Sequence, residues 1–357
     1  MSRGAADEPI PLWGAFDGAP HPSAQTQLIG HDAAEQALLS AYRQGRMHHA
    51  WILSGPDGIG KATLAYRMAR FLMVNPDPNS ASVQCADNLA VDGQHPAARQ
   101  TMRLAHPDVM VLQRGWNKDR KAFYGEIRVD DVRRAVSFFN TTAGAGGWRV
   151  CIIDTADEMN TAATNAVLKV LEEPPPRCLF LLLSSAVRWL LPTIRSRCRL
   201  LALEPLSPTD ITTVLHSLPD LTGRADEMLI GQAAPAAQGS VRRALDLLDG
   251  EGLAAYETLD RIFSSLPHLD MRAAFELAEA VAGRDGEAAF ERFAEKVHDW
   301  IHARSLQHMV GGGRDVQRWC ALWEKSLTQI QEALVYNLDR RPLVLSLLSE
   351  MARASRT

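Results

Sequence analysis

Cysteine is scarce in this sequence, and the cysteines that are present form no known motif. The chain of 357 residues contains five of them: Cys85, Cys151, Cys178, Cys198 and Cys320. An odd number of scattered cysteines without a C-x-x-C pair argues against a disulfide framework and against a zinc ribbon. We therefore expect no structural metal site.

Long apolar runs and a strong charge imbalance are also missing. The longest apolar stretch, around residues 178 to 183, is far shorter than the ~20 residues that span a bilayer. Asp7 and Glu8 lie where a secretory signal needs an apolar core. The formal net charge of -4 argues against a generally basic nucleic-acid wrapper but allows a local basic patch. We expect a cytoplasmic protein that has no membrane partner.

The sequence does contain a segment that nearly matches a phosphate-binding loop. In "GPDGIGKAT", Gly55, Gly60 and Lys61 occupy their places in the pattern G-x-x-x-x-G-K-[ST]. Backbone N–H groups of such a loop surround phosphates, and the lysine reaches the β and γ oxygens. The position of the Mg²⁺-binding hydroxyl is held by Ala62. Thr63 follows, but it is turned about 100° further round a helix and is not a simple substitute.

The surroundings of this loop are those that a phosphate site needs. Residues 49 to 56 are typical of a short buried strand, and residues 61 to 73 of a helix with Leu64, Met68 and Leu72 on one face. The free N–H groups and the dipole at the start of such a helix favour a bound anion. The sequence therefore predicts a nucleotide or anion site.

A second apolar segment ends in an acidic residue that can complete this site. Residues 150 to 153 are expected to form a buried strand that ends in Asp154, which suits the binding of Mg²⁺. Related ATPases need a carboxylate directly after this aspartate, but the next residue is Thr155. Asp157 and Glu158 come two and three positions later, and a general base must lie within hydrogen-bond reach of its proton. We therefore expect weak or absent ATP hydrolysis.

Apolar strands alternate with helices in the first part of the chain, and only helical patterns follow. A third buried strand is expected at 178 to 185 and a helix at 129 to 139. This alternation indicates an α/β fold with a parallel sheet. The predicted parts are a loose leader at 1–24, the α/β domain at 25–204 with an insertion at 75–108, a small helical lid at 205–250 and an all-α domain at 251–357.

The last helical segment carries an apolar stripe with spacings of mainly three and four residues. Its members are Val316, Trp319, Trp323, Leu327, Ile330, Leu334 and Leu338. Most stripes of this kind belong to a core, and an oligomer interface is the alternative.

Four segments together resemble the clamp-loader branch of the AAA+ proteins, and within it the delta-prime subunits of bacterial DNA polymerase III. They are "GPDGIGKATLA", "VCIIDTADEMN", "TNAVLKVLEEPPP" and "TIRSRC". The resemblance covers about residues 28 to 348. It implies an AAA+ P-loop domain with helices on both faces of its sheet, then the lid, then a C-terminal helical collar that joins subunits into a ring.

The resemblance gives two arginines a role. The arginine of the S-R-C element, here Arg197, reaches in this family across a subunit boundary to the γ-phosphate of ATP on a neighbour. Its fixed charge and planar fork suit that task. The alternative is a solvated arginine; if the stretch is extended, Arg195, Arg197 and Arg199 share one side. Arg242 matches the sensor 2 arginine, or is simply a first-turn residue behind an N-cap at Ser240.

The resemblance also assigns the residues of a degenerate nucleotide site. They are Gly55, Gly58, Gly60, Lys61, Ala62, Thr63, Asp154 and Arg242. No cofactor is required by this interpretation, and it leaves open whether ATP or ADP binds.

The insertion at 75–108 departs from the family pattern. Clamp-loader subunits of this kind commonly carry a four-cysteine zinc module here, whereas this segment has Cys85, with His95 and His106 as distant candidates. Four ligands at suitable spacing cannot be assembled from them. We expect packing, without zinc, to hold this segment together.

The resemblance implies a stator, a subunit that does not itself hydrolyse ATP. Its partners would be gamma/tau and delta subunits in a hetero-oligomeric ring, the sliding clamp, and primed DNA reached through the assembled complex. The chain would belong to the DNA polymerase III holoenzyme, although no segment resembles a polymerase site. The alternative is an active AAA+ ATPase of a clamp loader or repair complex, with Thr63 replacing the lost hydroxyl and Asp157 or Glu158 the lost base.

Overall fold

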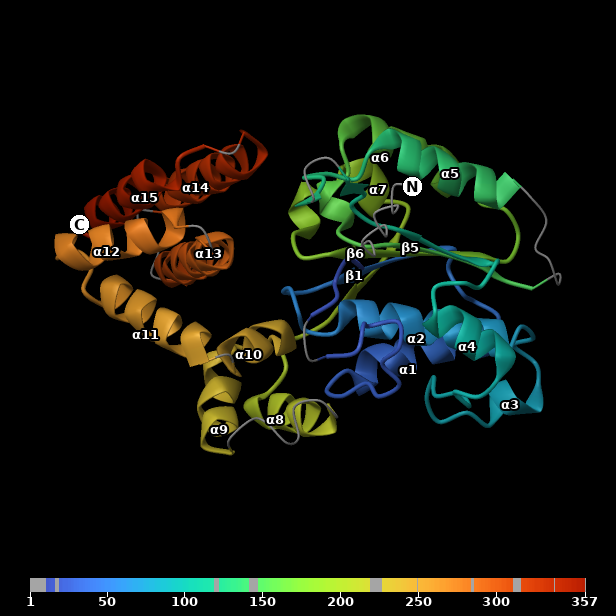
Figure 1. Ribbon diagram of the computed structural model, residues 1–357. Coiled ribbons are helices and arrows are strands. Elements are labelled where there is room, and N and C mark those ends of the chain that lie inside the picture. The colour runs from blue at the N-terminus through green and yellow to red at the C-terminus, as the bar shows by residue number, and fades with distance from the viewer. Residues whose placement is uncertain are drawn as a thin grey trace, which may run out of the picture. The chain divides into compact units, whose positions relative to one another are not determined.

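The computed structural model describes residues 11–16, 19–118, 122–140, 147–218, 227–248, 250–283, 286–310, 316–336 and 338–356. The chain forms two compact units, Met1–Leu248 and Asp249–Thr357 (Figure 1). No helix in these ranges is long and apolar enough to cross a membrane. The finer division at residues 24, 204 and 250 stays a prediction.

A parallel sheet of five strands forms the centre of the first unit. In spatial order the strands are β2 (Val109–Leu112), β5 (Arg149–Ile153), β6 (Cys178–Ser184), β1 (Ala50–Ser54) and β7 (Arg199–Ala202). Each neighbouring pair runs parallel. This arrangement confirms the α/β fold that the sequence predicts.

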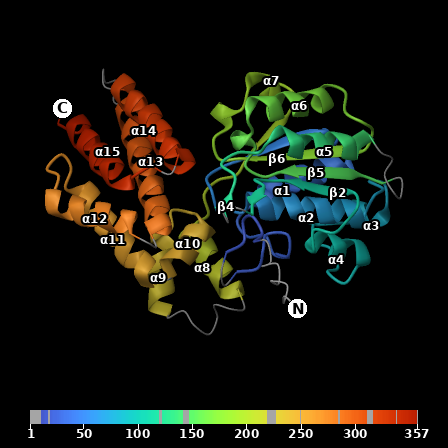
Figure 2. The same cartoon turned by 45° about the horizontal axis from the view of Figure 1, so that its top comes forward.

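Helices cover both faces of this sheet. On one face lie α1 (Asp32–Arg43), α2 (Lys61–Val74), α3 (Ala81–Gln84) and α4 (Pro96–Met102), and on the other α5 (Val129–Asn140), α6 (Thr161–Glu172) and α7 (Pro192–Arg195) (Figures 1 and 2). Successive side chains of β1 alternate accordingly. Trp51 and Leu53 pack into the cluster with α1 and α2, whereas Ala50 and Ile52 pack into the cluster with α5 and α6.

Several elements escape the sequence prediction because they are short or only partly buried. The two edge strands, β2 and β7, are missed, and β7 is mostly exposed, with Leu200 55% accessible. A small hairpin of β3 (Trp116–Asn117) and β4 (Ala122–Phe123) is missed as well. The insertion at 75–108 contains two short helices, α3 and α4.

Three short helices complete the first unit and lie in the segment 205–250, for which the sequence predicts a helical lid. They are α8 (Pro208–Ser217), α9 (Glu227–Ala236) and α10 (Val241–Leu248), which pack against one another. Ser207 begins α8 with a capping box, because its hydroxyl accepts from the amide of Asp210 and the Asp210 carboxylate accepts from the amide of Ser207.

Every described element of the second unit is a helix, in agreement with the all-α segment that the sequence predicts. The unit consists of α11 (Gly250–Ser264), α12 (Met271–Ala282), α13 (Gly286–Val310), α14 (Val316–Tyr336) and α15 (Arg340–Ala354). Trp319 and Ile330 of the apolar stripe are buried in its core, and Trp323 packs against it. Leu338 follows α14 and is 51% exposed, so it leaves the stripe. The side chains of Val316 and Leu334 lie outside the described residues.

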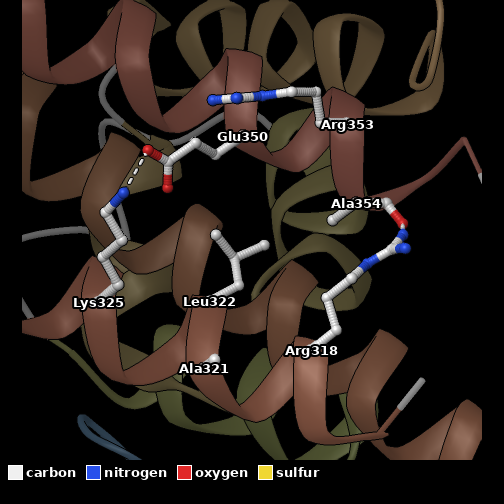
Figure 3. A pocket seen from close by; sticks show the side chains of 7 residues that line it. All are labelled: Arg318, Ala321, Leu322, Lys325, Glu350, Arg353 and Ala354. Atoms are coloured by element: carbon white, nitrogen blue, oxygen red, sulfur yellow. Dashed lines mark hydrogen bonds and ion pairs between the residues drawn. The ribbon is translucent and has the colours of Figure 1, made fainter. Parts of the chain in front are cut away.

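A groove with a volume of about 380 Å³ lies on the second unit between α14 and α15 (Figure 3). Leu322 lies at its centre, and the side chain of Lys325 bridges the two helices to Glu350, with 2.6 Å between Nζ and Oε1. Arg318 donates to the carbonyl of Ala354 at the end of α15. These contacts join α14 to α15. All the site residues predicted from the sequence lie in the first unit.

Candidate functional site

The glycine loop connects the carboxyl end of β1 to the first residue of α2. Gly55, Gly58 and Gly60 have φ values of 150°, 73° and 108°, which side chains rarely adopt. A Cβ on Gly55 would lie 2.5 Å from the carbonyl oxygen of Leu203, so the loop also needs this glycine for close approach. The loop therefore has the backbone shape of a phosphate-binding loop.

The ammonium group of the loop lysine is hydrogen-bonded to oxygen atoms of the loop itself. Nζ of Lys61 donates to the carbonyl oxygens of Gly55 at 2.6 Å and Pro56 at 2.7 Å, and lies 3.2 Å from Oδ1 of Asp57. An ammonium group has three donors, and these acceptors can satisfy all of them. Lys61 is buried. A phosphate would have to displace these partners in order to contact it.

The lid contacts the loop directly. The amide of Val241, the first residue of α10, donates to the carbonyl of Gly58 at 2.9 Å. A Cβ on Gly58 would overlap Oγ of Ser240 and lie 2.6 Å from Cβ of Arg242. The structure thus brings Arg242 beside the glycine loop. The Ser240 hydroxyl also accepts from the amide of Arg243 at 3.2 Å, as expected of an N-cap, whereas the sensor 2 role of Arg242 stays a prediction.

His31 also supports the loop, although no motif in the sequence includes it. The residue precedes α1 and is buried. Nε2 of its ring lies 2.6 Å from the carbonyl oxygen of Ile59, to which it can donate, and the ring packs close to Gly60. Nothing in the local sequence indicates this contact, because it joins residues distant along the chain.

The residue at the hydroxyl position of the loop is an alanine, and a threonine follows it. Ala62 is half-buried and packs against the core that includes α1 and α2. Thr63 is half-buried too, one position further along α2. The structure therefore places an apolar methyl group where the loop pattern requires a hydroxyl.

Asp154 lies at the end of β5, as predicted. Its amide donates to the carbonyl of Leu112 on β2 at 2.8 Å. The pKa of the carboxyl group is raised to about 6, mainly by burial; the nearby Lys61 opposes this rise, and the charges of Asp57 and Glu158 contribute to it. The carboxyl group thus shares its surroundings with the lysine of the glycine loop.

Thr155, which replaces the expected catalytic carboxylate, has an unusual backbone. Its φ of 57° and ψ of 53° lie in the left-handed region, which is rare for a β-branched residue. Its hydroxyl donates to the carbonyl of Asp154 at 2.6 Å. The side chain is therefore engaged with its own backbone, and it has no group that can accept a proton from water.

The two later carboxylates are both in other contacts. They lie on η1 (Ala156–Glu158), the turn after β5. Asp157 accepts from the hydroxyl of Ser185 at 3.2 Å. Glu158 forms an ion pair with Arg114, and burial is the main reason why the pKa of Glu158 is raised. Glu158 would have to leave Arg114 to replace the missing base, and Asp157 has one of its two oxygens bound to Ser185.

The arginine of the S-R-C element lies just beyond α7. Nη1 of Arg197 donates to the carbonyl of Thr193 at 3.0 Å and approaches Oγ of Ser196 at 3.4 Å. Nη2 lies 2.9 Å from Oε1 of Glu172, the last residue of α6. The Arg197 side chain is 35% exposed. The guanidinium is accessible and its orientation is fixed by three oxygen atoms.

The neighbouring arginines do not share one side with it, contrary to the expectation for an extended stretch. Arg195 ends α7 and is exposed. Arg199 starts β7 and its guanidinium lies 4.8 Å from the ring centre of Trp51. A short helix and turn therefore replace the extended backbone that would align the three.

The cysteine-poor insertion uses its histidines differently from a zinc module. The side chain of His95 caps α4 by accepting from the amide of Ala97 at 3.3 Å. His106 accepts from the amide of Asp108 at 3.1 Å. Cys85 is exposed at the end of α3. The side chains of His95 and His106 thus take part in a local helix cap and a local turn.

The strand order, the glycine loop after β1 and the aspartate after β5 together define a P-loop protein of the AAA+ class. Residues 30–207 match the family model described as "DNA polymerase III, delta subunit". Through this segment, the chain belongs to that family of clamp-loader subunits.

Two curated relatives are named DNA polymerase III subunit delta'. The one from Pseudomonas aeruginosa is 36% identical over 200 residues, which cover 55% of this chain and 56% of the relative. The one from Escherichia coli is 32% identical over 225 residues, covering 63% of this chain and 61% of the relative. The alignments thus span less than two thirds of each relative. The resemblance to delta-prime subunits is confirmed.

Solved structures with similar folds are more distant. A Thermotoga maritima protein related to the DNA polymerase III gamma subunit is 16% identical, with a TM-score of 0.41 over 89% of this chain and 100% of its own. The RuvB branch migration motor of Thermotoga maritima is also 16% identical, with a TM-score of 0.42 over 91% of each chain.

Proposed function

We propose that this chain is a stator-type subunit of a bacterial clamp loader, which does not hydrolyse ATP and supplies Arg197 to ATP bound by a neighbouring subunit. One contrast carries this proposal. The guanidinium of Arg197 is accessible and held in a fixed orientation, whereas Nζ of Lys61 is buried among acceptors of its own loop. The arginine that would act on a neighbour's ATP is accessible. The lysine that would bind this chain's own nucleotide is hydrogen-bonded within its loop.

We infer the neighbouring subunits of the ring from the names of related proteins. Relatives of this chain include subunits named gamma and tau of DNA polymerase III as well as delta'. Gamma/tau and delta subunits would form the ring with this chain through the helical collar. The assembly would place the sliding clamp on primed DNA, and this chain would thus belong to the DNA polymerase III holoenzyme without a polymerase site of its own.

An active ATPase is the second candidate, and the local contacts argue against it. Thr155 has no basic group in place of the missing carboxylate, and its hydroxyl is bound to its own backbone. Glu158 is paired with Arg114. Hydrolysis would require several of these contacts to break together. ATP or ADP could still occupy the loop as a structural ligand if Lys61 changed partners.

The test is ATP hydrolysis by the gamma/tau and delta subunits of the same organism, reconstituted with this chain. Arg197→Ala should lower the rate of the assembly without reducing its formation, and the isolated chain should be silent. Arg195→Ala is the matched control, because it removes an equal charge from an exposed position close by. Equal rates for the two variants would refute the proposed role, and turnover by the isolated chain would favour the ATPase.

A further inference from the structure

The carboxylate of Glu172, the last residue of α6, forms an ion pair with Arg197, which lies just beyond α7. Its Oε1 lies 2.9 Å from Nη2 of the guanidinium. Glu172 belongs to the L-E-E-P-P ending of α6, and Arg197 to the S-R-C element after α7. Two segments that are far apart in the sequence therefore meet in one ion pair.

The backbones on both sides of this pair are fixed by buried neighbours. Leu171, directly before the glutamate, and Ile194, three residues before the arginine, are buried in the same hydrophobic cluster. Cys198, directly after the arginine, packs against that cluster too. The carboxylate and the guanidinium are thus brought together by the packing of α6 against α7, and their meeting does not depend on the flexibility of their long side chains.

The pattern of contacts leaves part of the guanidinium available. Thr193 and Ser196 provide acceptors for Nη1, and Glu172 provides one for Nη2. The guanidinium carries five N–H donors in a rigid fork. Its Nε has no partner among the residues that the structure describes. A phosphate oxygen can therefore approach without displacing the glutamate.

The accessibility of this pair indicates what it contributes. The side chains of Arg197 and Glu172 are 35% and 50% exposed, and exposed ion pairs contribute little to the stability of a fold. Their larger effect is on orientation, because an arginine that is already held loses less conformational freedom when it binds its target. We therefore expect this ion pair to matter more for the orientation of Arg197 in the proposed function than for the stability of the fold.

We propose that Glu172 is a positioning residue, which keeps the guanidinium of Arg197 oriented toward the γ-phosphate of ATP on the neighbouring subunit. This inference rests on the function proposed above. Glu172 does not touch the nucleotide; it acts through Arg197. The glutamate stays bound to Nη2 while the free edge of the fork meets the phosphate.

The test uses the reconstituted clamp loader and measures ATP hydrolysis as a function of ATP concentration. Glu172→Ala should lower the rate at saturating ATP about 3- to 10-fold, since loss of orientation slows the chemical step, and should leave KM unchanged. Glu172→Gln keeps an acceptor oxygen and should recover most of the rate. Glu173→Ala, which removes the same charge from the next, exposed residue, should behave like the unmodified chain.

A double variant separates positioning from a structural effect. Adding Glu172→Ala to Arg197→Ala should lower the rate no further, because the glutamate acts only through the arginine. Thermal unfolding of each variant shows whether the fold is kept. If Glu172→Ala matches the unmodified chain while Arg197→Ala is slow, the inference is wrong and the proposed function stands.

Two further outcomes are equally decisive. A faster assembly with Glu172→Ala would show that the glutamate restrains the arginine, which overturns the inference. An unchanged rate with Arg197→Ala would overturn the proposed function, and the inference with it.

Discussion

The amide of Val241 donates to the carbonyl oxygen of Gly58 at 2.9 Å, so the first turn of the lid helix α10 is bound to the glycine loop. The loop in turn holds its own lysine through the carbonyls of Gly55 and Pro56. In this structure the loop serves as a docking surface for the lid. The polar groups of the loop thus form hydrogen bonds within the protein.

Gly58→Ala should destabilise the first unit by about 2 kcal/mol, because it combines left-handed strain with a steric clash. The residue has a φ of 73°, and an added Cβ would overlap the side chain of Ser240. Gly45→Ala is the matched control, since its φ is 65° but nothing lies within 4 Å of the added atom. Urea unfolding measures both. Equal losses for the two variants would show that the lid does not pack on the loop.

Thr155→Asn should raise the free energy of unfolding by about 0.5–1 kcal/mol, since asparagine adopts the left-handed region more readily than a β-branched residue. The φ of 57° at Thr155 motivates this expectation. Thr213→Asn, in the regular helix α8, should have no such benefit. Urea unfolding at neutral pH compares the two substitutions, and a loss of stability with Thr155→Asn would contradict the backbone described for this position.

Asp154→Asn should stabilise the protein increasingly as the pH rises from about 4 to about 6. Burial raises the pKa of Asp154 to about 6, so the folded state favours the protonated form and ionisation costs stability above this range. A neutral asparagine avoids this cost. A shift of about 2 units corresponds to roughly 3 kcal/mol, and we expect about 2 kcal/mol at pH 7 because the side chain is partly exposed.

The measurement is the difference in the free energy of unfolding between Asp154→Asn and the unmodified chain at pH 4 and at pH 7. The difference should be near zero at pH 4 and favour the variant at pH 7. An equal difference at both values would mean that the carboxyl group titrates normally in the folded protein.

The core of the sheet was predictable from the sequence, and its edges were not. β1, β5 and β6 are buried along their whole length, and a parallel sheet covered on both faces needs such continuous apolar runs. β7 exposes most of its residues although residues 200 to 202 are apolar, so its short run does not identify it as a buried strand. Edge strands depend on pairing with a strand that is already in place, and local composition reports this only weakly.

The candidate site, too, was only partly predictable from the sequence. The sequence was sufficient to place Lys61 at the start of a helix and Asp154 at the end of a strand. It was not sufficient to predict that Lys61 binds the carbonyls of its own loop or that His31 donates to Ile59. Such contacts depend on the path of the backbone through space. The pairing of Arg197 with Glu172 is of this kind, although both residues belong to recognisable motifs.

The most direct test of the account compares Lys61→Met with Arg197→Ala in the reconstituted clamp loader. If this chain acts on a neighbour's ATP, Arg197→Ala lowers the rate of hydrolysis of the assembly at unchanged composition, whereas Lys61→Met leaves it near that of the unmodified assembly. The opposite pattern, with Lys61→Met slow and Arg197→Ala unaffected, would show that this chain hydrolyses ATP in its own loop and would contradict the account.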